Sequence, residues 1–200
     1  MSFFVVIPAR YDSRRLPGKP LVDIAGIPMI QYVYESAKKS SAEDVIVATD
    51  DSRILEAVEK FGGKALLTSK DHRSGTERVQ EVANQLDFSL NDIVVNVQGD
   101  EPLIPPAAID IVAAALNEKK EFGIATLCET ATEGIENPNI VKVVMNSFGE
   151  ALYFSRSPIP YSANSNNYFR HVGLYAYRVD ALNQFVNFPA SMCEDSENLE

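Results

Sequence analysis

Short apolar runs alternate with segments of helical periodicity over residues 3–128, and this alternation constrains the fold more than any other feature. Unbroken apolar strands that alternate with helices are typical of a parallel sheet with both faces covered. The chain therefore predicts an α/β fold, with a mostly parallel, mixed sheet and helices on both faces. The predicted strands are Phe3–Ile7, Asp44–Thr49, Lys64–Thr68, Asp92–Val97 and Phe122–Cys128, and the predicted helices are Pro28–Lys39, Asp51–Phe61, Ser74–Leu86 and Pro105–Lys119.

The alternation of strands and helices ends after residue 138. The segments Ile140–Met145, Ala151–Phe154 and His171–Tyr177 resemble strands joined by turns, and no long helix separates the first two. We expect an α+β extension of the same sheet, so that residues 1–200 form a single domain. The polar stretch Ser162–Asn167 predicts a loop.

The distribution of charge along the chain restricts the kinds of ligand that it is expected to bind. The chain has a net charge of −10, yet residues 1–20 alone have a net charge of +3. An acidic protein repels nucleic-acid backbones, so a local basic segment favours a small anionic ligand. Two cysteines without a metal-binding spacing indicate ordinary reduced thiols. The chain has neither an apolar run of membrane-spanning length nor the pattern of a signal peptide, so we expect no membrane association and a cytoplasmic location.

Three polar segments follow predicted strands, where open parallel sheets bind ligands. The first contains Arg10, Arg14, Arg15, Gly18 and Lys19, a composition suited to phosphate oxygens, although a solvated basic loop would look the same. Lys19 precedes Pro and not Ser or Thr, which excludes a Walker A loop, and no dinucleotide glycine fingerprint is present. This absence disfavours an NAD-dependent oxidoreductase.

The other two segments have structural explanations as well as functional ones. Asp100 leaves a strand where a carboxylate could hold Mg²⁺, but Gly-Asp before Pro is also ordinary turn chemistry. Ser74 and Glu77 fit a capping box, and the same helix start could bind a base or phosphate. Asp50 or Asp51 fits a helix N-cap.

In combination these segments resemble a known family. The nucleotide loop of sugar cytidylyltransferases is similar to Pro8-Ala9-Arg10-x-x-Ser13-x-Arg15-Leu16-Pro17-Gly18-Lys19-Pro20. The resemblance extends through Ala48–Asp51, Asp71–Arg78, Val95–Pro102, Val141–Val144, Ala151–Arg156 and Arg170–Arg178. The whole set is similar to the 3-deoxy-manno-octulosonate (Kdo) cytidylyltransferases, or CMP-Kdo synthetases.

The resemblance implies a Rossmann-like nucleotidyltransferase fold with a sugar-binding extension. The implied reaction is CTP plus Kdo giving CMP-Kdo and pyrophosphate for lipopolysaccharide, with Mg²⁺ as cofactor and a homodimer as the assembly. It implies that Arg10, Arg15 and Lys19 bind the triphosphate and act in catalysis with Asp100, which would also be the metal ligand. It implies Ala9, Ser74, Gly75 and Thr76 around the cytidine, and Gln98, Arg156, His171 and Tyr175 at the sugar acid. A lone histidine near a strand is otherwise more often structural.

The pattern departs from the family at two places. An Arg-Asp pair that usually follows the Ser-Arg motif is replaced by Ser162-Ala163-Asn164. The sequence ends at Glu200, before a Gly-Val-Asp-Thr segment whose Asp is the family's second metal ligand, so we expect that a C-terminal segment is missing. Cytidylyltransferases for 8-amino-Kdo or a sialic acid, and a catalytically impaired nucleotide-binding relative, remain alternatives.

Overall fold

The structure is a computed structural model that describes residues 2–12, 16–161 and 167–199. The chain divides into two compact units, one formed by Met1–Ala125 and Leu174–Asn187, the other by Thr126–Gly173 and Phe188–Glu200. The elements, in chain order, are β1 (Phe3–Ala9), the 3-10 helix η1 (Lys19–Leu21), β2 (Asp23–Ile24), β3 (Ile27–Pro28), α1 (Met29–Ala37), β4 (Asp44–Thr49), α2 (Ser52–Lys60), β5 (Lys64–Leu67), α3 (Gly75–Gln85), β6 (Ile93–Asn96), α4 (Pro106–Glu118), β7 (Ile124–Ala131), β8 (Lys142–Met145), β9 (Ala151–Ser155), β10 (Tyr168–Arg178), α5 (Val179–Phe185) and α6 (Met192–Glu197).

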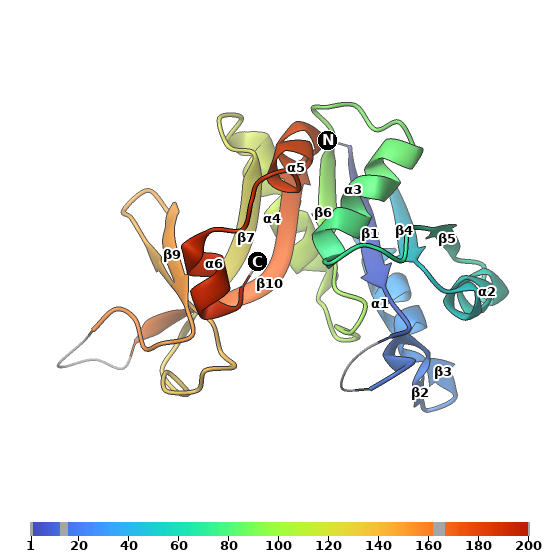
Figure 1. The fold of residues 1–200 in the computed structure, drawn as a ribbon, viewed down its shortest axis with the longest axis horizontal. Coiled ribbons are helices and arrows are strands. Elements are labelled where there is room, and N and C mark those ends of the chain that lie inside the picture. The colour runs from blue at the N-terminus through green and yellow to red at the C-terminus, as the bar shows by residue number, and fades with distance from the viewer. Residues whose placement is uncertain (1, 13–15, 162–166, 200) are drawn as a thin grey trace. The chain divides into compact units, whose positions relative to one another are not determined.

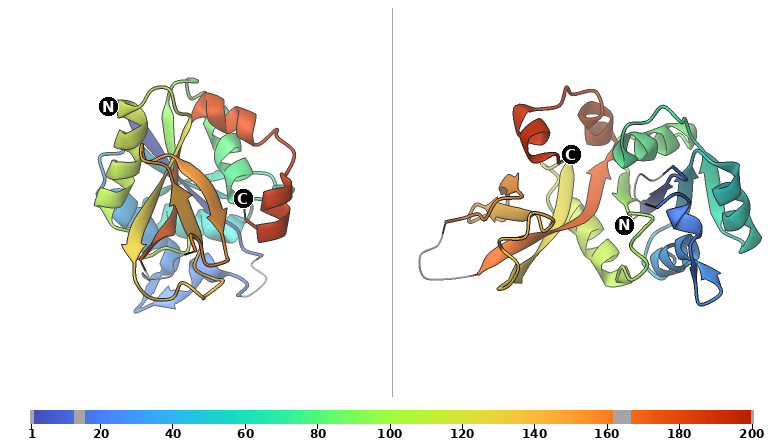
Figure 2. Two further views of the ribbon diagram at one scale, coloured as in Figure 1. Left: turned by 90° about the vertical axis from the view of Figure 1, so that its left-hand side faces the viewer. Right: turned by 60° about the horizontal axis from the view of Figure 1, so that its bottom comes forward.

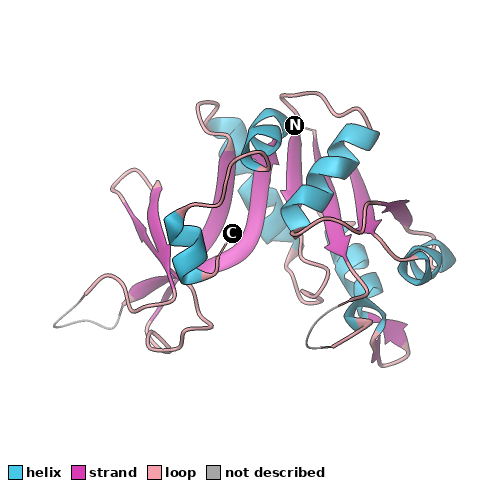
Figure 3. Ribbon diagram, viewed as in Figure 1, coloured by secondary structure: helices cyan, strands magenta, loops and turns pink. Residues whose placement is uncertain are grey.

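A mostly parallel sheet forms the centre of the first unit (Figures 1 and 3). Its strands follow the order β5-β4-β1-β6, and β1 is parallel to both β4 and β6. The last residues of β10 then pair antiparallel with β6, with Tyr175 opposite Asn96. The predicted mixed, mostly parallel sheet is confirmed.

Helices cover both faces of this sheet, as predicted (Figure 2). On one face, Val79 and Val82 of α3 and Leu182 of α5 pack against Val6 and Ile46 of the strands. Because side chains alternate along a strand, the neighbours of Val6 and Ile46 point to the opposite face, where α1 and α4 pack together. The apolar residues of both faces are fully buried, which explains the continuous apolar runs in the sequence.

Strand β1 runs through Pro8 to Ala9, two residues further than predicted. Proline interrupts a strand when its missing N–H faces a partner. The carbonyl oxygen of Val6 accepts from Val97, so the polar backbone groups of residues 6 and 8 both point to the β6 side. The ladder between β1 and β6 ends at Val6, and Pro8 therefore removes no ladder hydrogen bond.

The second unit contains antiparallel strands, as the end of the alternation predicts. β8 pairs with β9 and with the first residues of β10, and β7 also pairs with β10. Lys142 is completely buried here, and its Nζ donates to the backbone carbonyls of Asn137, Ile140 and Arg156. Three carbonyls satisfy the three donors of an ammonium group, so one lysine joins the loop before β8 to the chain after β9.

The elements that the sequence pattern did not predict are short. They are the two-residue strands β2 and β3, the helical turn η1 and the helix α5. Such segments are shorter than the window in which a hydrophobic period can be recognised. In the described part of the chain, no helix combines the length and the apolar character needed to cross a membrane.

Candidate functional site

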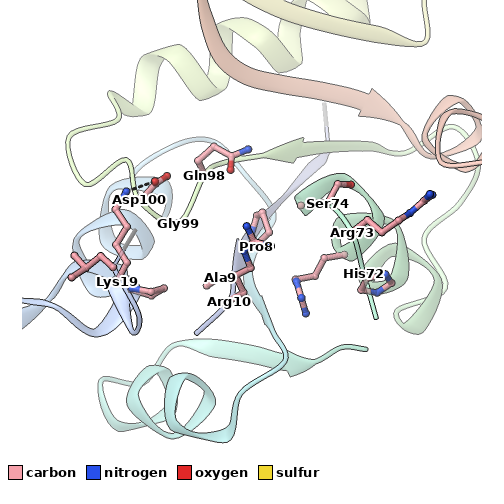
Figure 4. A pocket seen from close by; sticks show the side chains of 14 residues that line it. Pro8, Ala9, Arg10, Lys19, His72, Arg73, Ser74, Gln98, Gly99 and Asp100 are labelled. Carbon is pink, nitrogen blue, oxygen red and sulfur yellow. Dashed lines mark hydrogen bonds and ion pairs between the residues drawn. The ribbon is translucent and has the colours of Figure 1, made fainter. Parts of the chain in front are cut away.

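A cavity of about 500 Å³ lies in the first unit, at the ends of β1 and β6 (Figure 4). This volume is within the range of small-molecule sites. Its position at the carboxyl ends of parallel strands is the one expected for an open α/β sheet. The lining residues are Pro8, Ala9, Arg10, Leu16, Lys19, Pro20, His72, Arg73, Ser74, Gly75, Arg78, Gln98, Gly99 and Asp100.

The structure thus brings together seven residues that the sequence assigned to a site: Ala9, Arg10, Lys19, Ser74, Gly75, Gln98 and Asp100. Lys19 and Asp100 lie at one end of the cavity, Ser74 lies at the other, and Ala9 lies between them (Figure 4). The site has an elongated arrangement, with different chemistry at its two ends. Arg15 falls outside the described residues.

Gly99 explains how two loops reach the same cavity. A Cβ atom on Gly99 would lie 2.8 Å from the carbonyl oxygen of Pro8, closer than real side chains approach. Only glycine allows the backbone after β6 to pass this close to the end of β1. The Gly-Asp motif therefore places Asp100 at the cavity wall, beyond its role as a turn.

An ion pair joins the basic loop to the Gly-Asp motif. Lys19 Nζ donates to Asp100 Oδ2 at 2.5 Å, although the two residues are 81 positions apart. Gly18 precedes Lys19 with a φ of +70° and packs under the ring of Tyr11, so a side chain at this position would be strained. Arg10 is exposed at the same cavity, and the loop therefore presents at least two cations to it.

The N-terminus of α3 forms the opposite wall. Ser74 is its N-cap, with its hydroxyl accepting from the backbone N–H of Glu77 at 3.2 Å. The reciprocal half of the predicted capping box is wrong, because the Glu77 carboxylate accepts from the backbone N–H of Arg73 instead. Thr76 is buried in the first turn and is not among the lining residues.

Three ionisable residues of the cavity were not assigned from the sequence: His72, Arg73 and Arg78. His72 contacts the carboxylates of Glu77 and Glu81, which lie one turn apart on α3. Arg78 forms an ion pair with Asp50 at 2.8 Å. Of the two aspartates predicted as N-caps, Asp51 has that role in α2. All three residues lie in the segment Asp71–Arg78, which resembles the family. The local sequence pattern did not predict a role for any of them.

The sugar-acid candidates have other neighbours. Gln98 lines the cavity, whereas Arg156 and His171 belong to the second unit. The guanidinium of Arg156 donates to the backbone carbonyls of Pro138, Glu197 and Asn198. These bonds attach the end of α6 to the strand region, which is a structural role. The assignment of Arg156 to the sugar stays a prediction.

His171 and Tyr175 are also partly buried. The His171 Nε2 atom lies 2.9 Å from the Thr126 hydroxyl, and the ring packs edge-on against Phe154. Burial lowers the pKa of His171 to about 4, so the ring is neutral at pH 7. A neutral ring donates a hydrogen bond but supplies no positive charge to a sugar carboxylate. Tyr175 stacks on Tyr177 with ring centroids 5.9 Å apart.

Comparison with known proteins places this site in a family. The family model described as cytidylyltransferase matches residues 4–200. The chain belongs to the cytidylyltransferase family. It is 52% identical to the 3-deoxy-manno-octulosonate cytidylyltransferase of Saccharophagus degradans and 54% identical to that of Pseudomonas syringae, covering 100% of this chain and 84% of each relative. The resemblance found in the sequence is confirmed.

Solved structures agree with the fold. The structure of CMP:2-keto-3-deoxy-manno-octonic acid synthetase complexed with CTP matches with a TM-score of 0.93 and 48% identity, covering 99% of this chain and 82% of the other. A cytidylyltransferase from Leptospira borgpetersenii matches with a TM-score of 0.62 at 18% identity, which shows the shared fold alone. The chain is therefore a nucleotidyltransferase of the α/β class.

Proposed function

We propose that this protein transfers CMP from CTP to Kdo, giving CMP-Kdo and pyrophosphate for lipopolysaccharide synthesis. The observation that supports it most is the cavity, which joins a cationic end at Lys19 and Asp100 to a helix N-terminus at Ser74. Identities of 52% and 54% with relatives that are named for this reaction support the choice of substrates. Because CTP is a cytoplasmic metabolite, we place the reaction in the cytoplasm.

In this proposal the anomeric hydroxyl of the sugar attacks the α-phosphorus of CTP. The new bond joins the sugar oxygen to phosphorus, and the hydroxyl proton is released to solvent. The bond that breaks joins the α-phosphorus to the bridging oxygen, and pyrophosphate leaves. Arg10 and Lys19 bind the phosphate oxygens and neutralise the charge that develops on the leaving group. Ala9, Ser74 and Gly75 hold the cytidine, with Thr76 assigned to support them from inside the first turn of α3, so that the α-phosphate is fixed in line with the acceptor. Arg15 is assigned to the phosphates with Arg10.

The residues present fit a magnesium ion. Magnesium ions in nucleotide sites use one or two carboxylates and take their other ligands from phosphates and water. Asp100 is a partly exposed carboxylate at the phosphate end of the cavity, and its position matches this requirement. Among the described residues, no group of three or more His, Cys, Asp or Glu side chains could form an all-protein metal cage. We assign Asp100 to Mg²⁺, which when bound supplies charge neutralisation to the phosphates.

The proposal assigns four residues to the sugar acid: Gln98, Arg156, His171 and Tyr175. It also proposes that the protein forms a homodimer.

The alternative functions are transfer of CMP to 8-amino-Kdo or to a sialic acid, and CTP binding without transfer. Purified protein should be incubated with CTP, Mg²⁺ and each sugar acid, with the nucleotide-sugar product identified by mass spectrometry and pyrophosphate measured in parallel. CMP-Kdo as the main product supports the proposal. CTP binding without pyrophosphate release would indicate an impaired relative, and sedimentation measures the assembly.

A further inference from the structure

Arg78 is a buried cation in the wall of the cavity, and the reaction described above gives it no role. It lies in α3, four residues after the N-cap Ser74, so both side chains are on the same side of the helix. The residue is 3% exposed, whereas the phosphate-end cations Arg10 and Lys19 are more accessible. A buried guanidinium requires hydrogen-bond partners and a counter-ion.

Three residues from two strand ends fix the orientation of this guanidinium. Its Nη2 donates to Asp50 Oδ2 at 2.8 Å, at the end of β4. Its Nη1 donates to the Thr68 hydroxyl and to the Ser69 carbonyl, at the end of β5. Among the bonds that Arg78 makes in the described chain, none uses its Nε–H, and one N–H of Nη2 is also left over. The planar fork is thus held rigidly, with donors remaining for a ligand.

The charge of the Arg78–Asp50 pair indicates which part of a nucleotide the Arg78 guanidinium would bind. Asp50 neutralises Arg78, and the pair has little exposure to solvent, at 4% and 17% of the two side chains. A triphosphate gains most from unpaired, accessible cations such as those at the other end of the cavity. A rigid, neutralised donor pair next to Ser74 is better suited to an uncharged ring with hydrogen-bond acceptors.

We propose that Arg78, held by Asp50, is the residue that selects the base of the nucleotide. Cytosine presents adjacent acceptors at O2 and N3, which match a pair of N–H donors. Uracil has a hydrogen atom on N3, so the same donors would face a donor. A site built for one hydrogen-bond pattern rejects an analogue that lacks it, because buried groups are left unpaired. This inference rests on the proposed use of a cytidine nucleotide.

The test compares CTP with UTP in the wild type, Arg78→Met and Arg78→Lys. Both variants lose the fork, and Arg78→Lys keeps the positive charge as an ion-pair partner for Asp50. We expect the ratio of kcat/KM for CTP over UTP to fall by about tenfold to a hundredfold in both, since the hydrogen bond to N3, which distinguishes cytosine from uracil, is lost. Most of the fall should come from weaker CTP use, with UTP little changed.

Arg178→Met is the matched control. Arg178 is also an arginine whose guanidinium donates to backbone carbonyls, those of Leu116 and Phe122, but it does not line the cavity. Its loss should lower stability and leave the CTP/UTP ratio unchanged. If a variant of Arg78 proves inactive, calorimetric titration with CTP and UTP reads the same ratio without catalysis.

The outcomes separate this inference from the proposed function. A wild-type enzyme that prefers CTP, with Arg78 variants that keep the same preference while both nucleotides weaken equally, would leave Arg78 a structural residue and overturn the inference. A wild-type protein that neither binds CTP nor releases pyrophosphate would instead overturn the proposed function. A lost preference in both Arg78 variants, with the preference kept in Arg178→Met, supports the inference.

Discussion

Lys19 and Asp100 have opposite charges and form an ion pair at one end of the cavity. The 2.5 Å contact between them keeps the lysine side chain over the cavity in the absence of an anion. Both side chains are partly exposed, at 36% and 47%, so the pair contributes little to folding stability. In the proposed function the pair acts by position, because a phosphate group of CTP replaces the carboxylate as the partner of Lys19.

Replacing Lys19 by alanine is expected to weaken CTP binding by about 1.5–3 kcal/mol, the range for a hydrogen bond to a charged group. Isothermal titration with CTP, and with ATP and GTP for comparison, measures the effect. Lys64→Ala is the matched control, because it removes a lysine that is also 2.5 Å from an aspartate but lies on β5 and does not line the cavity. Equal CTP affinity in wild type and Lys19→Ala would remove Lys19 from the phosphate site.

Replacing Asp100 by asparagine keeps the shape of the side chain and removes its charge. We expect a folded protein whose pyrophosphate release falls by at least about a hundredfold at saturating CTP, since the carboxylate ligand for Mg²⁺ is lost. Activity of the wild type should also disappear with a chelator and return with added Mg²⁺. Glu101→Gln serves as the control, because it removes the adjacent exposed carboxylate, which does not line the cavity. A larger loss in Glu101→Gln would move the metal assignment by one residue.

At the scale of elements, the cavity depends on how closely the chain after β6 approaches the end of β1. Gly99 allows this approach, and the first residue of α3 also packs against Pro8, since a Cβ on Gly75 would lie 3.3 Å from the proline ring. The chain after β6 and the N-terminus of α3 thus both pack against Pro8 near the end of β1. The geometry of the site is therefore coupled to backbone packing in the first unit.

Gly99→Ala is expected to destabilise the protein by about 1–3 kcal/mol, the usual cost of inserting a methyl group where there is no space. CTP affinity should fall as well, because Asp100 is displaced with its loop. Gly173→Ala is the control, since a Cβ there meets nothing within 4 Å and the residue is exposed. Urea unfolding and CTP titration of both variants measure the two effects, and a Gly99→Ala protein as stable as the control would contradict the packing argument.

For the molecule as a whole, the partly buried imidazole of His171 makes stability depend on pH. Its pKa of about 4 in the folded protein is below the ordinary value of 6.5, so the unfolded chain binds the proton more tightly. The stability that the neutral ring contributes is complete above pH 6.5. It is lost as the pH falls from 6.5 towards 4, at up to about 1.4 kcal/mol per pH unit.

Urea unfolding at pH 7 and pH 5 should therefore show a loss about 1–2 kcal/mol larger in the wild type than in His171→Gln, which has no titrating ring at this position. The two proteins differ at position 171 alone, so contributions from the rest of the chain cancel in the comparison. An identical pH dependence in the two proteins would show that folding does not change the pKa of His171, and would contradict this prediction.

The sequence by itself determined the strands and helices of the parallel sheet, because apolar periodicity and caps such as Asp51 and Ser74 act over a few neighbouring residues. It also indicated the polar loops of the site, since ligand loops follow parallel strands. Only the tertiary structure decided that Lys19 pairs with Asp100 and that Arg78, which lines the cavity, pairs with Asp50. Those contacts join residues far apart in the chain, and they form only when the sheet brings strand ends together.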